Sequence, residues 1–517
     1  MDVWSWICEL PNSEEFSLSN SLVFPLTTDS SVQIKAEKSF GSNLPDPISV
    51  TFSVCSSTST LWISNTCNLY SDEKPFLPLI LQLLQEIIAR SPNAHESTCP
   101  RSQLQKLNSD PVTWILDSHS TESFSSFFNL IFLTRLFWIC VMDAPSEIGT
   151  LYFNSIFAPN LGIFSCKNSP VLRNFFISVG TDVEICFVRT FGYMIAKWLI
   201  LREVSGAGLK SITPPPLPSD KGFSYATESH GLWILKGYTP IKATNCLWSD
   251  DGRKNQFPVV EAKESVLKYA LAHQQLEAII QMEYTVGFND GYIQIHARVD
   301  NIRLHVVKLG FRNKDDEDFL DEKYFPSRVR VWVGPEIGAN YLSGLSLGRS
   351  TDNMEKEVEV QKVFKGDFGN SKTPEVKATA RMTTKTKIKN WRWDQDVEGN
   401  SAIFDVVLCD NSTGIEISTW KPAIGGAGPS LANDIVKRYN GARRVFTKNG
   451  GVIFSDEECK NGVRWRLNKE MEGSVLRWRI GGQVWLTYWP NDIKSSYNET
   501  RCVEWCDEVD LPLIPPK

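Results

Sequence analysis

The sequence predicts an α+β fold: an N-terminal mixed α+β domain with buried helices, then a mainly antiparallel β domain. Two observations carry this prediction. Apolar residues alternate at period two in short runs up to residue 54, and then recur at helical spacing up to residue 203. From residue 290 onward the pattern is almost wholly that of short strands, which a sandwich or barrel-like arrangement accommodates. One entrance helix is expected at the start of this second domain.

The first domain is expected to span residues 1–205. Val32–Ala36 and Ile48–Val54 alternate as strands do, whereas Leu79–Arg90 has helical periodicity and follows two prolines. Phe124–Met142 and Cys186–Glu203 are also predicted helices, and both are too apolar to lie freely on a surface. The domain is therefore expected to have a helical interior.

Residues 124–142 are long and apolar enough to be considered as a membrane span. About a dozen apolar residues favour insertion by about 5 kcal/mol, and Arg135 near the centre opposes it by about 3 kcal/mol. Asn129 and the neighbouring hydroxyl residues add a comparable penalty. Because the sum is near zero, a buried helix is favoured, and contact with a membrane is the alternative.

Residues 206–225 combine four prolines with glycines and are expected to be a Pro-rich linker. The β-rich domain, 226–517, then contains a predicted helix at 262–284, where apolar residues fall at three- and four-residue spacing and include His273 as a core residue. A shift of the apolar phase after Val299 predicts a hairpin turn at Asp300-Asn301. Further strands are expected at Arg328–Val333, Glu357–Phe364, Val376–Lys389, Ala402–Cys409, Gly414–Trp420, Val463–Leu467, Val475–Ile480 and Gln483–Trp489, with a short helix at Ser430–Tyr439.

The composition indicates a globular, intracellular protein. Of 517 residues, 42% are hydrophobic and 22% are charged, which argues against disorder as the main state. The net charge of −6 does not favour non-specific binding of nucleic acid. The twelve cysteines include no CxxC pair, so reduced thiols are expected rather than a zinc site. The acidic N-terminal segment lacks the basic region of a signal peptide, so the expected location is cytoplasmic, with the nucleus as an alternative, and not secreted.

The sequence contains one enzyme-like motif, the G-x-S-x-G of Gly344–Gly348. In α/β-hydrolases a histidine later in the chain serves as the base of this serine, but no histidine follows His305. The glycine-rich segment 425–430 lacks the Lys-Ser/Thr of a phosphate-binding loop. No catalytic residue and no cofactor is therefore predicted, and the sequence does not favour an enzyme.

His296 and His305 are weak candidates for metal ligands. A two-residue turn at Asp300-Asn301 would place them opposite each other on neighbouring strands. The same register would place Arg298 opposite Arg303, which is unfavourable, and no third ligand can be named. Exposed polar residues are the better interpretation, so no metal is predicted.

The chain has 17 tryptophans, and three of its strands repeat one Trp-Arg arrangement. Neighbouring residues on a strand point to opposite faces, so tryptophans are expected in the core and arginines on the outside. The arginines could simply be solvent-exposed surface residues, and a lysine-rich strand could simply protect a sheet edge against aggregation. They could also form a basic face that binds an acidic ligand. The candidate binding residues are Arg392, Arg464, Arg466, Arg477, Arg479, Lys377, Arg381 and Lys385.

These observations predict a non-enzymatic intracellular binding or adaptor protein that uses a basic face of the C-terminal β domain. The expected partner is a protein or another acidic ligand. Two alternatives stay open. One is an enzyme of unknown class with dispersed Asp and Glu acid–base residues, and the other is a peripheral membrane or lipid-binding protein that uses residues 124–142. We recognise no resemblance to a known family, so every inference rests on the residues themselves.

Overall fold

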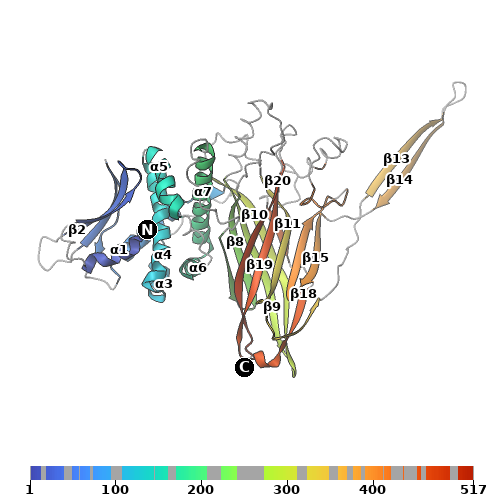
Figure 1. The fold of residues 1–517 in the computed structure, drawn as a ribbon. Coiled ribbons are helices and arrows are strands. Elements are labelled where there is room, and N and C mark those ends of the chain that lie inside the picture. The colour runs from blue at the N-terminus through green and yellow to red at the C-terminus, as the bar shows by residue number, and fades with distance from the viewer. Residues whose placement is uncertain are drawn as a thin grey trace. The chain divides into compact units, whose positions relative to one another are not determined.

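The computed structural model (Figure 1) forms two compact units that interleave along the chain. Unit 1 comprises residues 1–225, 238–276 and 307–317, and unit 2 comprises residues 226–237, 277–306 and 318–517. The boundary between units thus passes through several long strands, whereas the sequence suggested two consecutive domains. The structure describes residues 2–12, 19–39, 49–57, 59–69, 74–94, 107–144, 146–160, 170–205, 223–241, 273–310, 323–347, 359–368, 376–385, 390–410, 413–420, 435, 451–455, 462–489 and 499–515.

Unit 1 begins with an antiparallel sheet against which helices pack. Its strands are β1 (Ser19–Pro25), β2 (Ser31–Ser39), β3 (Ser49–Ser56) and β4 (Thr60–Ile63), in that spatial order, and β5 (Cys67–Asn68) pairs with β3. The alternating apolar residues of β2 and β3 point to one face and are fully or almost fully buried. The period-two runs near the N-terminus therefore form the strands that they predicted.

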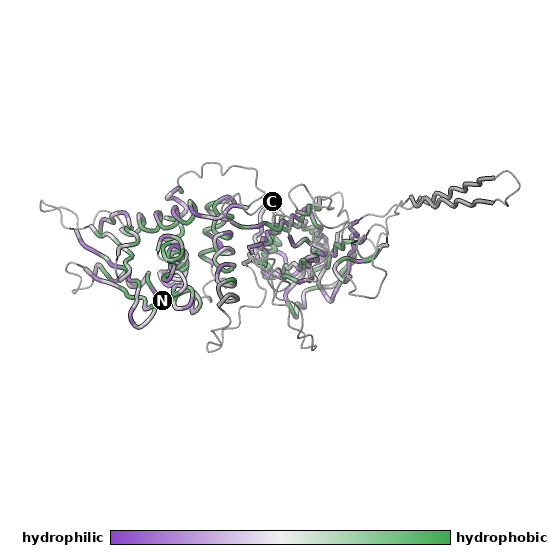
Figure 2. The backbone as a smooth tube through the Cα atoms, turned by 90° about the horizontal axis from the view of Figure 1, so that it is seen from above, coloured by the Kyte–Doolittle hydropathy of each residue, from purple (hydrophilic) through white to green (hydrophobic). Residues whose placement is uncertain are grey.

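The helices of unit 1 form its interior, and Figure 2 shows hydrophobic residues, in green, running through them. They are α1 (Val3–Glu9), α2 (Leu77–Arg90), α3 (Ser109–Ser118), α4 (Thr121–Trp138), α5 (Ser146–Tyr152), α6 (Pro170–Val179) and α7 (Thr181–Ser205). Short non-α helical turns cover Leu10–Asn12, Ile139–Asp143 and Phe153–Phe157. The three helices predicted from periodicity correspond to α2, α4 and α7.

Helix α4 is a core helix of unit 1. The segment Thr121–Asp143 has the length and hydropathy of a membrane span, and 89% of its most apolar window is buried inside the protein. Its polar residues have partners there: Asn129 accepts a hydrogen bond from the Val3 amide at 2.9 Å, and Arg135 donates to Glu86. The expectation of a buried helix at this position is confirmed.

Two larger sheets carry most of the remaining described strands. The eight-stranded sheet has the order β12-β18-β10-β9-β8-β7, and β17 and β6 also pair with β10. Its strands are β6 (Asn93–Ala94), β7 (Phe223–Ser229), β8 (Leu232–Ile241), β9 (Gln274–Phe288), β10 (Tyr292–Gly310), β12 (Leu342–Leu347), β17 (Gly451–Ser455) and β18 (Gly462–Asn468). The five-stranded sheet has the order β15-β16-β11-β19-β20, with β11 (Phe325–Pro335), β15 (Trp391–Glu398), β16 (Ser401–Leu408), β19 (Val475–Tyr488) and β20 (Glu499–Pro512).

Unit 2 contains a sandwich of these two sheets with tryptophans in its core. Trp465 on β18 and Trp478 on β19 are both fully buried, and their rings meet edge to face at 4.9 Å. Trp233 stacks on Tyr284 at 4.3 Å and also contacts Trp478. The sheets are mostly antiparallel and open. The predicted α+β class with a β-rich part is therefore confirmed. Trp465 and Trp478, each between two arginines of its strand, lie in the core as alternation predicted, whereas Trp332 and Trp485 are only partly buried.

The predicted helix at 262–284 is wrong over residues 274–284, which belong to strand β9. Leu276, Ala278, Ile280, Met282 and Tyr284 are buried while the residues between them are partly exposed. The apolar residues of this segment fit both a helical spacing and a period of two. Pairing with neighbouring strands of a large sheet stabilises the strand rather than the helix. Residues 262–272 lie outside the described part of the chain. His273 is buried and stacks on Tyr193 at 5.3 Å.

The predicted hairpin turn at Asp300-Asn301 is also wrong, because β10 runs unbroken from Tyr292 to Gly310. The apolar phase shifts at residues 300–301, between the segments of the strand that pair with two different partners. Residues 292–298 pair with β18, and residues 301–305 pair with β17.

Two other predictions differ from the structure, and a third falls largely outside the described residues. The two strands expected at 475–480 and 483–489 are one strand, β19. Residues 414–420 form turns with a single bridge between Cys409 and Glu416, rather than a strand. The helix expected at 430–439 lies outside the described residues except at Ile435.

Candidate binding surface

Strand β18 places two arginines side by side on the outer surface of the eight-stranded sheet. Val463, Trp465 and Leu467 are completely buried, whereas Arg464 and Arg466 are exposed. Since residues two apart on a strand share a face, the two guanidinium groups emerge about 7 Å apart along the strand. This part of the predicted basic face follows from simple alternation.

The strands on either side of β18 present uncharged or weakly basic residues to these arginines. Arg464 lies opposite His296 on β10 and opposite Ser346 on β12. Arg466 lies opposite Gln294 and Gly344 on the same two strands, and its guanidinium carbon lies 4.9 Å from the ring centre of Tyr292. We call the surface formed by Tyr292, Gln294, His296, Arg298, Ser346, Arg464 and Arg466 the β18 face.

The β18 face is positively charged even though His296 is not. Burial lowers the pKa of His296, and the guanidinium groups of Arg464 and Arg298 lower it further, against the opposing effect of Glu283. The imidazole is therefore neutral at pH 7. Arg298 donates from Nε to Glu283 at 2.7 Å, so one carboxylate balances one of the three arginines.

Arg477 and Arg479 lie on a different surface, the outer face of the five-stranded sheet. Trp465 and Trp478 meet in the core, so the arginines beside each of them point away from the core on two different sheets. On β20, Asp510 is the register partner of Arg477 and Glu508 that of Arg479.

Contacts within that sheet also hold these two arginines. Arg477 forms an ion pair with Glu508 at 3.7 Å, and Arg479 lies over the ring of Trp332 at 5.3 Å. Arg392 is exposed on β15 of the same sheet, opposite Val407. The predicted arginines therefore divide between two surfaces.

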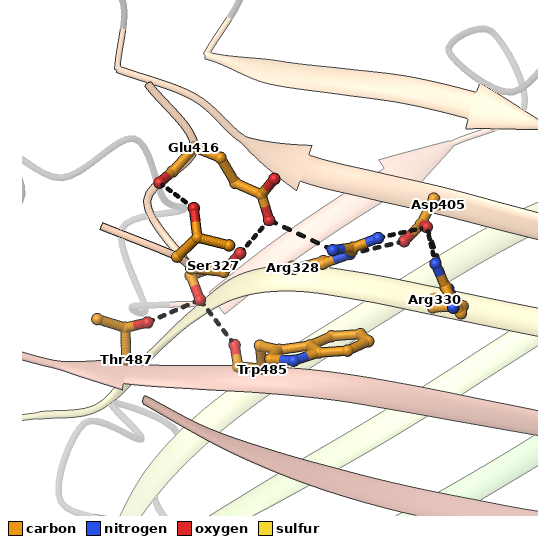
Figure 3. A network of polar contacts seen from close by, with 9 residues as sticks. Ser327, Arg328, Arg330, Asp405, Glu416, Trp485 and Thr487 are labelled. Carbon is orange, nitrogen blue, oxygen red and sulfur yellow. Dashed lines mark hydrogen bonds and ion pairs between the residues drawn. The ribbon is translucent and has the colours of Figure 1, made fainter. Parts of the chain in front are cut away.

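The outer face of the five-stranded sheet also carries an ion-pair network (Figure 3). Arg328 donates to both oxygens of Asp405 at 3.0 and 2.7 Å, and Arg330 donates to Oδ2 at 3.1 and 2.7 Å. Glu416 accepts from Arg328 at 3.4 Å, and the guanidinium of Arg328 lies over Trp485 at 4.9 Å. The two carboxylates of the network balance the charges of its two guanidinium groups.

Asp405 is ionised in this network. Burial raises its pKa, but the hydrogen bonds from Arg328 and Arg330 more than offset that effect and hold the pKa below its usual range. The hydrogen bond to Asp405 in turn raises the pKa of Arg328. Such reciprocal shifts are those of a bidentate arginine–carboxylate cluster that stabilises a surface rather than leaving charge free for a ligand.

The three candidate residues of the lysine-rich strand lie on β14 (Val376–Lys385), which pairs with β13 (Glu359–Phe368) in a separate two-stranded sheet. Their positions are fixed by the register, in which Lys377 pairs with Asp367, Arg381 with Val363 and Lys385 with Glu359. Residues 386–389, the rest of the predicted strand, lie outside the described part.

His296 and His305 do not face each other. Both lie on the continuous strand β10, where nine residues span about 30 Å. His296 pairs with Arg464, and His305 pairs with Gly451. Among the described residues no group of three or more His, Cys, Asp or Glu side chains could hold a metal ion. The proposed pairing of these histidines is therefore corrected.

Sequence reasoning missed the residues that surround Arg464 and Arg466. Tyr292, His296 and Arg298 reach this face through the pairing of β10 with β18, which joins segments more than 160 residues apart. No local pattern encodes such a pairing. The change of phase at residue 300, where β10 changes partner, was the only available signal, and a turn accounts for it equally well.

Comparison with known proteins identifies no family. No family model matches the chain, and no curated protein matches it. Among solved structures, the chain is similar to the Clostridium perfringens NetB toxin in the membrane inserted form (11% identity, TM-score 0.21), covering 56% of this chain and 98% of that one. It is also similar to a structure described as a pore forming protein (14%, 0.18, covering 46% and 96%) and to Clostridium perfringens delta-toxin (9%, 0.18, covering 56% and 96%).

Proposed function

We propose that this chain is a non-enzymatic intracellular binding protein that takes an acidic segment of a partner protein on the β18 face. One observation carries the proposal: Arg464 and Arg466 are exposed neighbours, and the register places no carboxylate opposite either of them on β10 or β12. On the five-stranded sheet Arg328, Arg330, Arg477 and Arg479 have carboxylates as register partners or in ion pairs, whereas Arg392 lies opposite Val407. The β18 face therefore has charge left for a ligand.

The geometry suits carboxylates presented by an extended peptide. Alternate side chains of such a peptide repeat at about 7 Å, the same spacing as two arginines on one strand. A guanidinium group can hold a carboxylate through two parallel hydrogen bonds. The ring of Tyr292 supports the guanidinium of Arg466 and reduces the side-chain entropy lost on binding.

A location in the cytoplasm, or alternatively the nucleus, belongs to the same proposal. Among the described residues Cys8, Cys55, Cys67, Cys140 and Cys506 are free thiols, which is the usual state in a reducing compartment. Contact of residues 124–142 with a membrane is not favoured, because helix α4 lies in the core of unit 1.

The test is binding of a fluorescent glutamate-rich peptide to the full chain at low ionic strength. The full chain is required because the two units interleave, so that no single cut separates them. The double variant Arg464→Glu/Arg466→Glu is expected to bind at least about tenfold more weakly, because it replaces two attractive charges with repulsive ones.

The matched control is Arg477→Glu/Arg479→Glu, which makes the same change of net charge on the other sheet. We expect it to bind within about twofold of the parent chain, because its arginines face carboxylates of β20. Equal losses in the two variants would show that only net charge matters, and the β18 face would lose its assignment.

A further inference from the structure

The hairpin β13–β14 is the second feature from which we infer a function. The strands pair over ten consecutive positions, from Glu359↔Lys385 to Phe368↔Val376, without a shift of register. Among the described strands this two-stranded sheet has no third member. An isolated two-stranded hairpin is marginally stable in water, so a hairpin of this length calls for a surface that covers it.

The residues of the hairpin separate by chemical type into two alternate sets of register positions. One set is Val360, Lys362, Phe364, Gly366, Phe368, Val376, Ala378, Ala380, Met382 and Thr384. The other set is Glu359, Gln361, Val363, Lys365, Asp367, Lys377, Thr379, Arg381, Thr383 and Lys385. Alternate residues of a strand belong to opposite faces, so one face is apolar except at Lys362 and Thr384, and the other is polar except at Val363.

The length and alternation fit a lipid bilayer. A strand that crosses a membrane has about 9–11 residues with a tilt of about 45°, and its residues alternate between lipid-facing apolar and water-facing polar types. Ten residues extend about 33 Å, which at that tilt covers about 23 Å, close to the apolar band of about 25 Å. Lys362 lies three positions from the end of β13, near a boundary, where a charge is tolerated better than at mid-depth.

We propose that β13–β14 is a membrane-inserting hairpin whose apolar face meets lipid. Its two outer edges carry backbone N–H and C=O groups that lipid cannot satisfy, so insertion requires edge-to-edge pairing with hairpins of further copies. The polar set then faces water, and the pairs Lys377–Asp367 and Lys385–Glu359 place opposite charges at matching depths. This proposal is independent of the acidic-peptide function of the β18 face.

The test uses the full chain with phosphatidylcholine vesicles that contain a self-quenched dye. These vesicles have no net charge, so the arginines of the β18 face do not decide the result. We expect the parent chain to float with the vesicles and to release dye. Ala378→Glu/Ala380→Glu changes two apolar positions and is expected to reduce release by about tenfold or more, because each carboxylate would have to enter lipid.

The matched control is Thr379→Glu/Thr383→Glu, which adds the same two charges to the polar set of the same strand. Its release is expected to stay within about twofold of the parent. The proposal fails if the parent neither floats nor releases dye, or if the two double variants lose release equally.

A second measurement keeps the test decisive if either variant unfolds. Residues 359–385 of the vesicle-bound parent chain are expected to resist protease, and cleavage there as fast as in solution would contradict insertion. The variant Arg464→Glu/Arg466→Glu is expected to retain dye release, so failure of one proposal is distinguishable from failure of the other.

Discussion

At the scale of single residues, the arginines of the sandwich differ in what faces them rather than in exposure alone. Arg328 and Arg330 share the carboxylate of Asp405, and Glu416 completes the charge balance. Arg464 and Arg466 face a histidine, a glutamine, a serine and a glycine. The same side chain therefore forms ion pairs on one sheet, and on the other it lies opposite residues that carry no carboxylate.

Asp405 gives a prediction about pH. Its pKa is depressed in the folded protein, so its stabilising effect is complete above the unfolded value near 4 and is lost as pH falls through the folded value. Asp405→Asn is expected to lower the free energy of unfolding by about 2–3 kcal/mol at pH 7. Thermal unfolding across pH should show the gap between parent and variant narrowing below about pH 4. A gap independent of pH would contradict this role.

Arg135 gives a prediction about stability. Its side chain is only 4% exposed, and burial lowers its pKa while Glu86 opposes that effect. Glu86→Ala would leave a buried cation without its main partner and is expected to lower the free energy of unfolding by about 3 kcal/mol, measured by urea denaturation. The control Glu37→Ala removes an exposed carboxylate of β2 and should change stability by less than about 0.5 kcal/mol.

At the scale of elements, alternation and helical periodicity predicted α2, α4, α7 and most strands. They failed where two periods coexist, as in β9, because burial in a sheet depends on partners that a local pattern does not contain. They also failed in β10, where a phase shift marks a change of partner and not a turn. The arginines of β18 were predictable from alternation, but their neighbours on β10 and β12 were not.

The continuity of β19 rests on a close approach at Gly481. The sequence Gly481-Gly482 suggests a turn, yet both residues stay in the ladder, with Gly481 opposite Trp332. A Cβ atom at 481 would lie 2.2 Å from the ring of Trp332. Gly481→Ala is expected to lower the free energy of unfolding by about 1–3 kcal/mol because the indole must shift.

Gly291→Ala is a suitable control for this prediction, because a Cβ atom at 291 would meet nothing within 4 Å. Urea denaturation of both variants compares the two sites. Equal stability of the two variants would show that the contact between Gly481 and Trp332 does not constrain the strand.

At the scale of the whole molecule, two units share long strands instead of following one another along the chain. The proline-rich segment suggested a simple boundary, but β8, β9 and β10 each contribute residues to both units. The net charge of −6 also conceals a local basic face, because opposite charges are distributed over different surfaces. Global charge is therefore a poor guide to the charge of any single surface of this protein.

The dependence of peptide affinity on ionic strength should distinguish binding at the β18 face from attraction or repulsion by the net charge of the protein. Salt at 0.15 M screens exposed charges beyond about 8 Å, so the affinity for an acidic peptide is expected to fall as salt rises. Arg464→Glu/Arg466→Glu should have a flatter salt dependence than the parent, as measured by fluorescence anisotropy. The slope of Arg477→Glu/Arg479→Glu should equal that of the parent, and equal slopes for all three proteins would count against a local site.

The most direct test of the binding proposal is hydrogen exchange of the full chain with and without the glutamate-rich peptide. The β18 face predicts slower exchange in residues 292–298 and 462–468 on peptide binding, and unchanged exchange in residues 475–480 of the other sheet. Protection confined to 475–480, or the same small change across both sheets, would contradict the assignment of the β18 face.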